Sequence, residues 1–135
     1  EGALEVASRN CERHGVKVLL RQKDVLNAEP EGKLYDVIVS NPPYITNKEK
    51  VDMEANVLDW EPSLALFVPD EDPLLFYRKI ARLGCEILKE GGSLYFEINR
   101  AYGQETALML NELGYNQIEL KKDSWGNDRM IKAKR

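Results

Sequence analysis

The chain has 135 residues, the length of one domain, and its hydrophobic (43%) and charged (31%) residues are balanced as in a folded globular protein. Its 19 basic and 23 acidic side chains give a formal net charge of -4, which argues against broad electrostatic binding of nucleic acid. No apolar run approaches the length of a membrane span, so we expect no membrane association. The two cysteines, Cys11 and Cys85, lack metal-ligand spacing and are interpreted as reduced thiols.

The first predicted element is a helix over residues 3–14, which Gly15 ends. The next residues, Val16 to Arg21, alternate in the pattern of a strand, so we expect a strand over residues 16–22. Asp24 and Val25 would then lie at the carboxyl end of that strand.

The second predicted strand, residues 35–40, ends in a stiff corner formed by Asn41-Pro42-Pro43-Tyr44. Neither proline has an N–H to donate to a sheet, and each holds the residue before it in an extended conformation. The carbonyl groups of this corner therefore have no local N–H partners. Ligands of open α/β sheets bind at the carboxyl ends of the strands, which makes the corner the main candidate for a functional site.

The connection over residues 41–72 is long for a compact domain, and such loops are usually functional or disordered. Trp60 and Phe67 within it argue against disorder by composition. Asp72 as N-cap and Pro73 as first helical residue then predict the start of a helix.

That helix carries a predicted core stripe and is expected to end at the Gly91-Gly92 pair. Gly84 lies inside it, where a glycine can allow close packing at a cost of about 1 kcal/mol relative to alanine. The stripe consists of Phe76, Ile80, Leu83 and Ile87.

Further elements complete the chain. Alternation over residues 94–98 predicts a strand, with Glu97 near its carboxyl end. A helix is expected over residues 103–113. Two strands, around residues 118–120 and 130–133, are joined by a short turn, which predicts an antiparallel pair.

Helices that alternate with strands predict an α/β fold with a mostly parallel sheet and this antiparallel pair at its end. The chain is interpreted as a single domain over residues 1–135. It contains no P-loop, no Cys/His metal cluster and no Ser-His-Asp elbow. The single histidine, His14, lies beside the helix-ending Gly15 and is interpreted as a capping or surface residue.

The corner suits a substrate nitrogen whose lone pair is delocalised, such as an amide or an exocyclic amine. The side-chain carbonyl of Asn41 and the backbone carbonyl of Pro42 can accept its two N–H groups and stabilise the charge that develops as it attacks. Tyr44 can lie flat against the planar group. Most of the rate would come from positioning the nitrogen against an electrophilic carbon. The alternative is a stiff loop without chemical function.

Asn41-Pro42-Pro43-Tyr44 resembles motif IV of S-adenosylmethionine-dependent amino methyltransferases, which act on adenine, guanine or protein glutamine. Other segments resemble one of these families, the protein-release-factor glutamine methyltransferases. They are the helix with Ala3, Leu4, Ala7 and Asn10 followed by Asp24-Val25, the segment Glu61-Pro62-Ser63-Leu64-Ala65-Leu66, Glu97 with Gly103-Gln104, and Asp123 to Arg129.

The resemblance implies a Rossmann-like class I methyltransferase sheet and S-adenosylmethionine as cofactor. The implied reaction is methyl transfer to the amide nitrogen of the glutamine in the Gly-Gly-Gln motif of a peptide-chain release factor, a cytoplasmic modification in translation termination. It implies that Asn41 and the Pro42 carbonyl hold the amide and that Pro43 and Tyr44 complete its slot.

The resemblance also implies cofactor contacts from Asp24, Val25 and Asn41. Val25 matches a family position against the adenine ring, where a larger aromatic residue is frequent. The Gly-rich cofactor loop, the acidic ribose ligand, the first two strands and the N-terminal helical domain of the family are not found in the 135 residues. The chain is therefore interpreted as the C-terminal part of a catalytic domain and is expected to be inactive alone. Without the first two strands of the family, the predicted strands 16–22 and 35–40 would have unpaired edges, which predicts a non-native dimer.

Two other interpretations stay open. The same corner could serve an adenine or guanine amino-methyltransferase acting on DNA or rRNA, although the acidic balance makes nucleic acid an unlikely direct substrate. The chain could also be an inert fragment or an interaction module. Glu61 could orient the loop or the substrate, or be a carboxylate in a helix N-terminal turn. Glu97 could face the site from the end of its strand or form a structural hydrogen bond to the loop.

Overall fold

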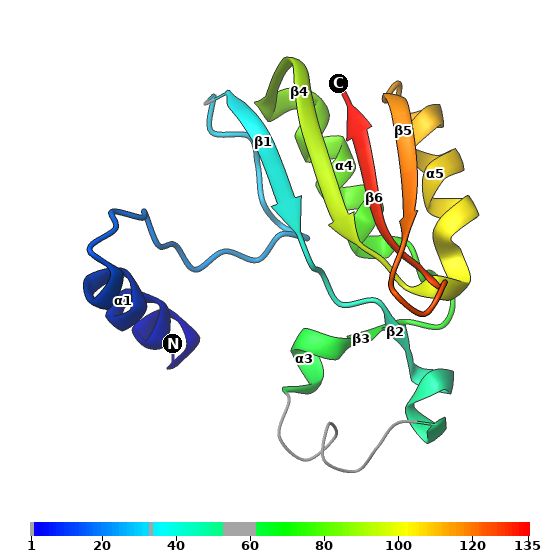
Figure 1. The fold of residues 1–135 in the computed structure, drawn as a ribbon, viewed down its shortest axis with the longest axis horizontal. Coiled ribbons are helices and arrows are strands. Elements are labelled where there is room, and N and C mark those ends of the chain that lie inside the picture. Colours follow the sequence, from blue (N-terminus) through cyan, green and yellow to red (C-terminus); the bar gives the residue numbers. More distant parts are fainter. Residues whose placement is uncertain (1, 33, 53–61) are drawn as a thin grey trace.

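The computed structural model describes residues 2–32, 34–52 and 62–135. Within these ranges the main sheet has four strands in the order β1-β4-β6-β5 (Figure 1). β1 runs parallel to β4, and β6 lies antiparallel to both β4 and β5. The other three strands thus share one direction, which confirms the predicted mostly parallel sheet with an antiparallel pair at its end. The bounds are Tyr35–Ser40 (β1), Leu88–Glu97 (β4), Asn116–Lys122 (β5) and Asp128–Lys134 (β6).

Two helices, α4 (Leu75–Ile87) and α5 (Gly103–Glu112), pack together on one face of this sheet (Figure 1). A short 3-10 helix, η2 (Arg100–Tyr102), leads from β4 into α5. The main hydrophobic core lies between the two helices and the sheet. Its most deeply buried side chains include Tyr77, Leu88, Leu94, Phe96, Ile98, Leu110 and Ile131. No helix in the described parts of the chain has both the length and the apolarity needed to cross a membrane.

Gly84 brings α4 close to the strand that begins after α5. The hydroxyl of Tyr115 donates a hydrogen bond to the Ala81 carbonyl (2.8 Å) and lies too close to Gly84 for a Cβ to fit there without a shift. The predicted close packing at Gly84 is thus confirmed. Burial raises the pKa of Tyr115, so this hydroxyl keeps its proton.

The predicted start of α4 was wrong by about two residues. Leu74, and not Asp72, is the N-cap residue, because residues 69–75 first form turns. The Asp72 carbonyl accepts the Leu75 N–H (3.1 Å), and its carboxylate pairs with Arg78 (2.6 Å). The predicted end was wrong too, since α4 stops at Ile87 and the Gly91-Gly92 pair lies within β4.

The buried face of α4 is rotated from the predicted stripe. Ile80 is buried as expected, but its buried neighbours are Tyr77, Ala81 and Gly84. The other predicted members, Phe76, Leu83 and Ile87, are only half-buried and line a cavity beside β1. The helix thus has two apolar faces, and periodicity alone did not separate them.

The N-terminal part of the chain differs from the prediction. The helix α1 (Gly2–His14) is present, and Gly15 ends it with a φ of 63°. The strand predicted over residues 16–22 was wrong, because this stretch is coil that leads away from α1 (Figure 1). No described segment pairs with it, and a strand forms only where a neighbour accepts and donates its backbone hydrogen bonds.

The connection after β1 is more ordered than predicted. Two short strands, β2 (Ile45–Thr46) and β3 (Phe67–Val68), pair in parallel and bring its two arms together. A 3-10 helix, η1 (Asn47–Asp52), follows β2, and a single helical turn, α3 (Ser63–Leu66), precedes β3. Glu61 and Trp60 lie outside the described residues.

Candidate active site

The predicted corner lies where two neighbouring parallel strands end. Ser40, the last residue of β1, is in register with Phe96 of β4. The chain leaves β1 through Asn41 and Pro42, and it leaves β4 through Glu97 and the residues that follow. The ends of β1 and β4 therefore present their side chains at one edge of the sheet, the position where α/β folds bind ligands.

The four residues of the corner differ in exposure. Pro42 is buried, Pro43 and Tyr44 are half-buried, and Asn41 is exposed. The burial of Pro42 fixes the backbone, since its ring is held by packing and its φ by covalent geometry. The Asn41 side chain thus projects toward solvent from a rigid base, as a group that contacts a substrate must.

Tyr44 is tied to the end of β4. Its hydroxyl donates to Oε1 of Glu97 (2.8 Å), and its ring packs against the core. Burial, followed by the hydrogen bond to Glu97, raises the pKa of Tyr44 above its ordinary value of 10.0. Tyr44 is therefore a neutral phenol at physiological pH. The structure places Glu97 against the corner as a partner of Tyr44, so Glu97 acts on the loop.

The turn between β5 and β6 supports the same edge. The Asp123 carboxylate accepts the N–H groups of Trp125 (2.9 Å) and Asn127 (3.0 Å), and these bonds hold its pKa below its usual range. Arg129 lies 3.5 Å from Asp123, measured from Nε to Oδ2. Its backbone carbonyl accepts the Ile98 N–H (2.9 Å), which joins this turn to the end of β4.

Asp24 and Val25 lie on the coil between α1 and β1. The exposed Asp24 carboxylate accepts the Leu26 N–H (2.9 Å) and the Asn27 side-chain amide (2.6 Å), so it stabilises its own turn. Val25 is half-buried and packs against the core. Of this pair, only Val25 points toward the region of the corner.

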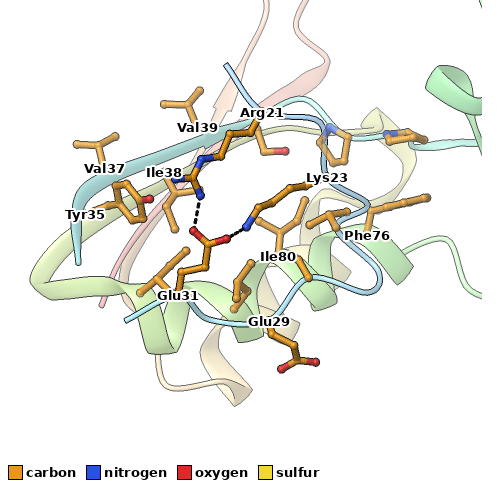
Figure 2. Close-up of a pocket in the computed structure, with 17 residues that line it drawn as sticks. Arg21, Lys23, Glu29, Glu31, Tyr35, Val37, Ile38, Val39, Phe76 and Ile80 are labelled. Atoms are coloured by element: carbon orange, nitrogen blue, oxygen red, sulfur yellow. Dashed lines mark hydrogen bonds and ion pairs between the residues drawn. The ribbon is translucent and has the colours of Figure 1, made fainter. Parts of the chain in front are cut away.

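A cavity of about 560 Å³ connects Val25 with the corner. It lies between the coil of residues 21–31, β1 and α4, and Figure 2 shows Ile38, Phe76 and Ile80 along one side. Its apolar lining includes Val25, Ala28, Val37, Ile38, Val39, Pro42, Pro43, Phe76, Ile80, Leu83 and Ile87.

Charged side chains border the same cavity. Arg21 and Lys23 both bond to the Glu31 carboxylate, so these charges satisfy one another (Figure 2). These three side chains come from the coil, on the side of the cavity away from the sheet. The cavity therefore suits a flat, largely apolar group.

Two residues that the sequence analysis did not single out, Glu49 and Asn99, form hydrogen bonds that hold the segment around Tyr44 and Thr46. Glu49 accepts hydrogen bonds from both the N–H and the hydroxyl of Thr46 (2.8 Å each), and Asn99 donates from its side-chain amide to the Tyr44 carbonyl (3.0 Å). Thr46-x-x-Glu49 is the spacing of a capping box, so the sequence held a signal for Glu49. The contacts of Asn99 with Tyr44 and Glu49 gave no such signal, because these partners are 55 and 50 positions away in the chain.

The chain is similar to known methyltransferases. The family described as "Methyltransferase small domain" matches residues 1–59. A release factor glutamine methyltransferase of Bacteroides thetaiotaomicron is 55% identical over 136 residues, which are 100% of this chain and 49% of that protein. The corresponding protein of Flavobacterium psychrophilum is 48% identical over 131 residues, 97% of this chain and 46% of that protein. The chain thus spans about half the length of the curated relatives it matches.

A solved structure resembles the fold. A possible exported protein from Bordetella parapertussis superposes with a TM-score of 0.62 over 99% of this chain and 50% of its own. At 17% identity this likeness concerns the arrangement of helices and strands alone.

Proposed function

The chain is a homologue of bacterial release factor glutamine methyltransferases over about half their length, and we propose that the whole protein methylates a glutamine side chain of a peptide-chain release factor. The methyl group would come from S-adenosylmethionine, and the acceptor would be the amide nitrogen of the glutamine in a Gly-Gly-Gln sequence. The proposal includes a cytoplasmic location and a part in translation termination. It rests above all on a corner that exposes Asn41 from a buried, hydrogen-bonded base.

The proposed task of the corner is to hold the glutamine amide. The Asn41 side-chain carbonyl and the Pro42 backbone carbonyl would each accept one N–H of the substrate nitrogen. Two acceptors raise electron density on this nitrogen and stabilise the positive charge that forms as it attacks. No strong base is needed at this stage, because the proton can leave after the new bond has formed.

Pro43 and Tyr44 would form the slot for the planar amide. Tyr44 cannot turn away, since its hydroxyl is held by Glu97. As a neutral phenol it offers an uncharged surface, which suits a neutral glutamine side chain better than an anionic one. The slot would thus orient the amide plane and exclude water from the attacking nitrogen.

The cavity beside the corner fits part of the proposed cofactor. Val25, Pro42 and Pro43 would hold the adenine end, since the lining is apolar and large enough for a flat ring. S-adenosylmethionine, when bound, supplies an electrophilic methyl group on a sulfonium. Asp24 is not placed on the cavity, and its carboxylate is used within its own turn. A cofactor contact from Asp24 therefore stays a prediction that needs a different turn conformation.

A chimera tests the proposal. The matching 136-residue segment of the Bacteroides thetaiotaomicron relative would be replaced by this chain, and the chimera incubated with S-adenosylmethionine and a release factor. We expect the mass of one added methyl group on the glutamine-containing peptide, and its loss in an Asn41→Ala variant. Asn111→Ala, an exposed change on α5, serves as the matched control.

Parallel reactions with DNA and rRNA separate the alternatives. Label in nucleic acid but not in the release factor would overturn the proposed substrate. An inactive chimera beside an active Bacteroides thetaiotaomicron enzyme would favour an inert chain. A calorimetric titration of S-adenosylmethionine into the 135 residues alone then shows whether they bind the cofactor without further chain.

A further inference from the structure

Asn99 lies two residues beyond Glu97 at the end of β4. Residues two apart on an extended chain project to the same side, so both side chains reach toward the corner, while Ile98 between them is buried in the core. Asn99 itself is only 4% exposed. A buried polar side chain needs partners for all its hydrogen-bonding groups, and these partners identify what it does.

The Asn99 side chain is fully engaged. Its Nδ2 donates to the Tyr44 carbonyl (3.0 Å) and to the Glu49 carboxylate (3.0 Å to Oε2), while its Oδ1 accepts the Ala101 N–H (2.9 Å). The amide can have only this orientation, because a flip would turn its oxygen toward two acceptors. The Asn99 backbone N–H also donates to the hydroxyl of Tyr77 (3.2 Å).

Glu49 fixes this orientation by its charge. Burial opposes ionisation of Glu49, but hydrogen bonds from Thr46 and then Asn99 outweigh it and hold the pKa of the carboxyl below its usual value of 4.5. The resulting carboxylate attracts one hydrogen of the Asn99 amide. The other hydrogen is thereby directed at the Tyr44 carbonyl.

We propose, on the basis of the proposed function, that Asn99 is the positioning residue of the corner. Tyr44 is held at both ends, its carbonyl by Asn99 and its hydroxyl by Glu97. The peptide unit that carries the Pro42 carbonyl lies two residues upstream and is stiffened by Pro43. Fixing Tyr44 therefore fixes the direction in which Asn41 and Pro42 present their acceptors. A small displacement there lowers the rate of the reaction without removing any group that touches the substrate.

The double variant Asn99→Asp/Glu49→Gln tests this role. It keeps the total charge, keeps the oxygen that caps Ala101, and keeps a hydrogen bond between positions 49 and 99, now donated by the glutamine amide. The Thr46 N–H and hydroxyl then donate to the neutral glutamine oxygen, the donor to the Tyr44 carbonyl is lost, and a carboxylate oxygen faces that carbonyl instead. The single variant Asn99→Asp breaks both bonds, and the exposed Asn111→Asp on α5 is the matched control.

In the chimera we expect the double variant to lose about 10- to 100-fold in kcat, with the KM for S-adenosylmethionine little changed. Its buried carboxylate should lower the denaturant midpoint, but by less than in the single variant, because a hydrogen bond between positions 49 and 99 is kept. The single variant should have both a lower denaturant midpoint and a lower kcat. A double variant with the kcat of the parent would overturn the proposal, because Asn99 would then contribute stability alone.

A measurement on the 135 residues themselves does not depend on activity. Tyrosines labelled at Cζ are titrated by NMR, and Tyr44 is assigned through Tyr44→Phe. In the double variant we expect the pKa of Tyr44 to fall toward 10.0, because the displaced ring is less buried and its bond to Glu97 is looser. An unchanged titration would contradict the positioning role. If the pKa of Tyr44 falls in the double variant while the parent chimera transfers no methyl group, the proposed function is wrong and the positioning of Tyr44 by Asn99 is still supported.

Discussion

Apolar residues of the same kind lie in opposite environments in two regions of this chain. In the C-terminal region (residues 34–52 and 62–135), Leu94 on β4 is 1% exposed. In the N-terminal region (residues 2–32), Val18 is 58% exposed although it lies on the apolar face of the alternation that predicted a strand, and its neighbour Leu19 is 71% exposed. β4 has paired neighbours on both edges, whereas residues 16–20 have no strand partner among the described residues. Alternation therefore specifies a strand only where the chain also supplies the neighbour.

β1 is intermediate between the two regions. One edge pairs with β4, and Ile38 packs toward the core. On the opposite face Val37 and Val39 are exposed, and β1 is the terminal strand of the described sheet (Figure 1). The strand forms because one partner is enough for its backbone. In the described part of the chain no strand pairs with its other edge, and such an edge can bind more chain.

The largest contrast is expected from one substitution made in both regions. Leu94→Ala removes a fully buried side chain and should lower the free energy of unfolding by about 2–5 kcal/mol. Leu19→Ala removes an exposed one and should change it by less than about 0.5 kcal/mol. Urea unfolding followed by circular dichroism measures both. A similar loss from Leu19→Ala would show that the N-terminal region is packed in solution.

Glycine substitutions give a second contrast. Gly84→Ala places a methyl group against the Tyr115 hydroxyl and should destabilise the fold by about 1–3 kcal/mol, despite the better helix propensity of alanine. Gly2→Ala, in α1, meets open space and should be neutral or slightly stabilising. Thermal unfolding compares the two. If Gly84→Ala were neutral, Tyr115 would have to leave the Ala81 carbonyl easily.

The open side of β1 leads to a third prediction. We propose that β1 associates with a second copy of the chain, because no described strand pairs with its outer edge and its own Val39 is 76% exposed. Val39→Lys should then raise the dissociation constant of the dimer at least about tenfold, since a charge on an edge strand opposes pairing. Leu108→Lys, at a 60% exposed position on α5, should leave it unchanged. Sedimentation equilibrium measures both variants. A monomer whose 35–40 amides are protected from exchange would refute the association.

Local patterns predicted much of the C-terminal region. α5, β1 and the β5–β6 pair follow from periodicity and turn residues, and the corner follows from two prolines after an apolar run. The face of α4 did not follow, since two apolar faces overlap within its 13 residues. For Glu97 the sequence left open a role toward the substrate or a hydrogen bond to the loop, and it did not give Tyr44 as the partner; the hydrogen bond of Asn99 to Glu49 was not predicted at all. These two hydrogen bonds join residues 53 and 50 positions apart, and only the pairing of β1 with β4 brings these residues together.

The smallest expected effect concerns two carboxylates, one in each region, whose pKa values are both lowered. Glu49 is stabilised as a carboxylate mainly by Thr46, and Glu31 by Lys23 and Arg21. In both cases the folded protein binds the proton more weakly than the unfolded chain does. The stabilisation is therefore present above the unfolded pKa of about 4.5 and is lost as the pH falls through the lower folded value.

The two carboxylates should respond differently to salt. Glu31 is exposed, so about 1 M salt screens its ion pairs, and Glu31→Gln should then leave the pH dependence of unfolding unchanged. Glu49 is half-buried and its hydrogen bonds come from neutral groups, which salt does not screen, while the attraction of Arg100 makes a smaller contribution. Glu49→Gln should therefore flatten the loss of stability below pH 4.5 in low and high salt alike. An effect of Glu49→Gln that vanished in high salt would mean that its carboxylate is held by surface charges, and the two regions would then not differ in how they hold an acidic side chain.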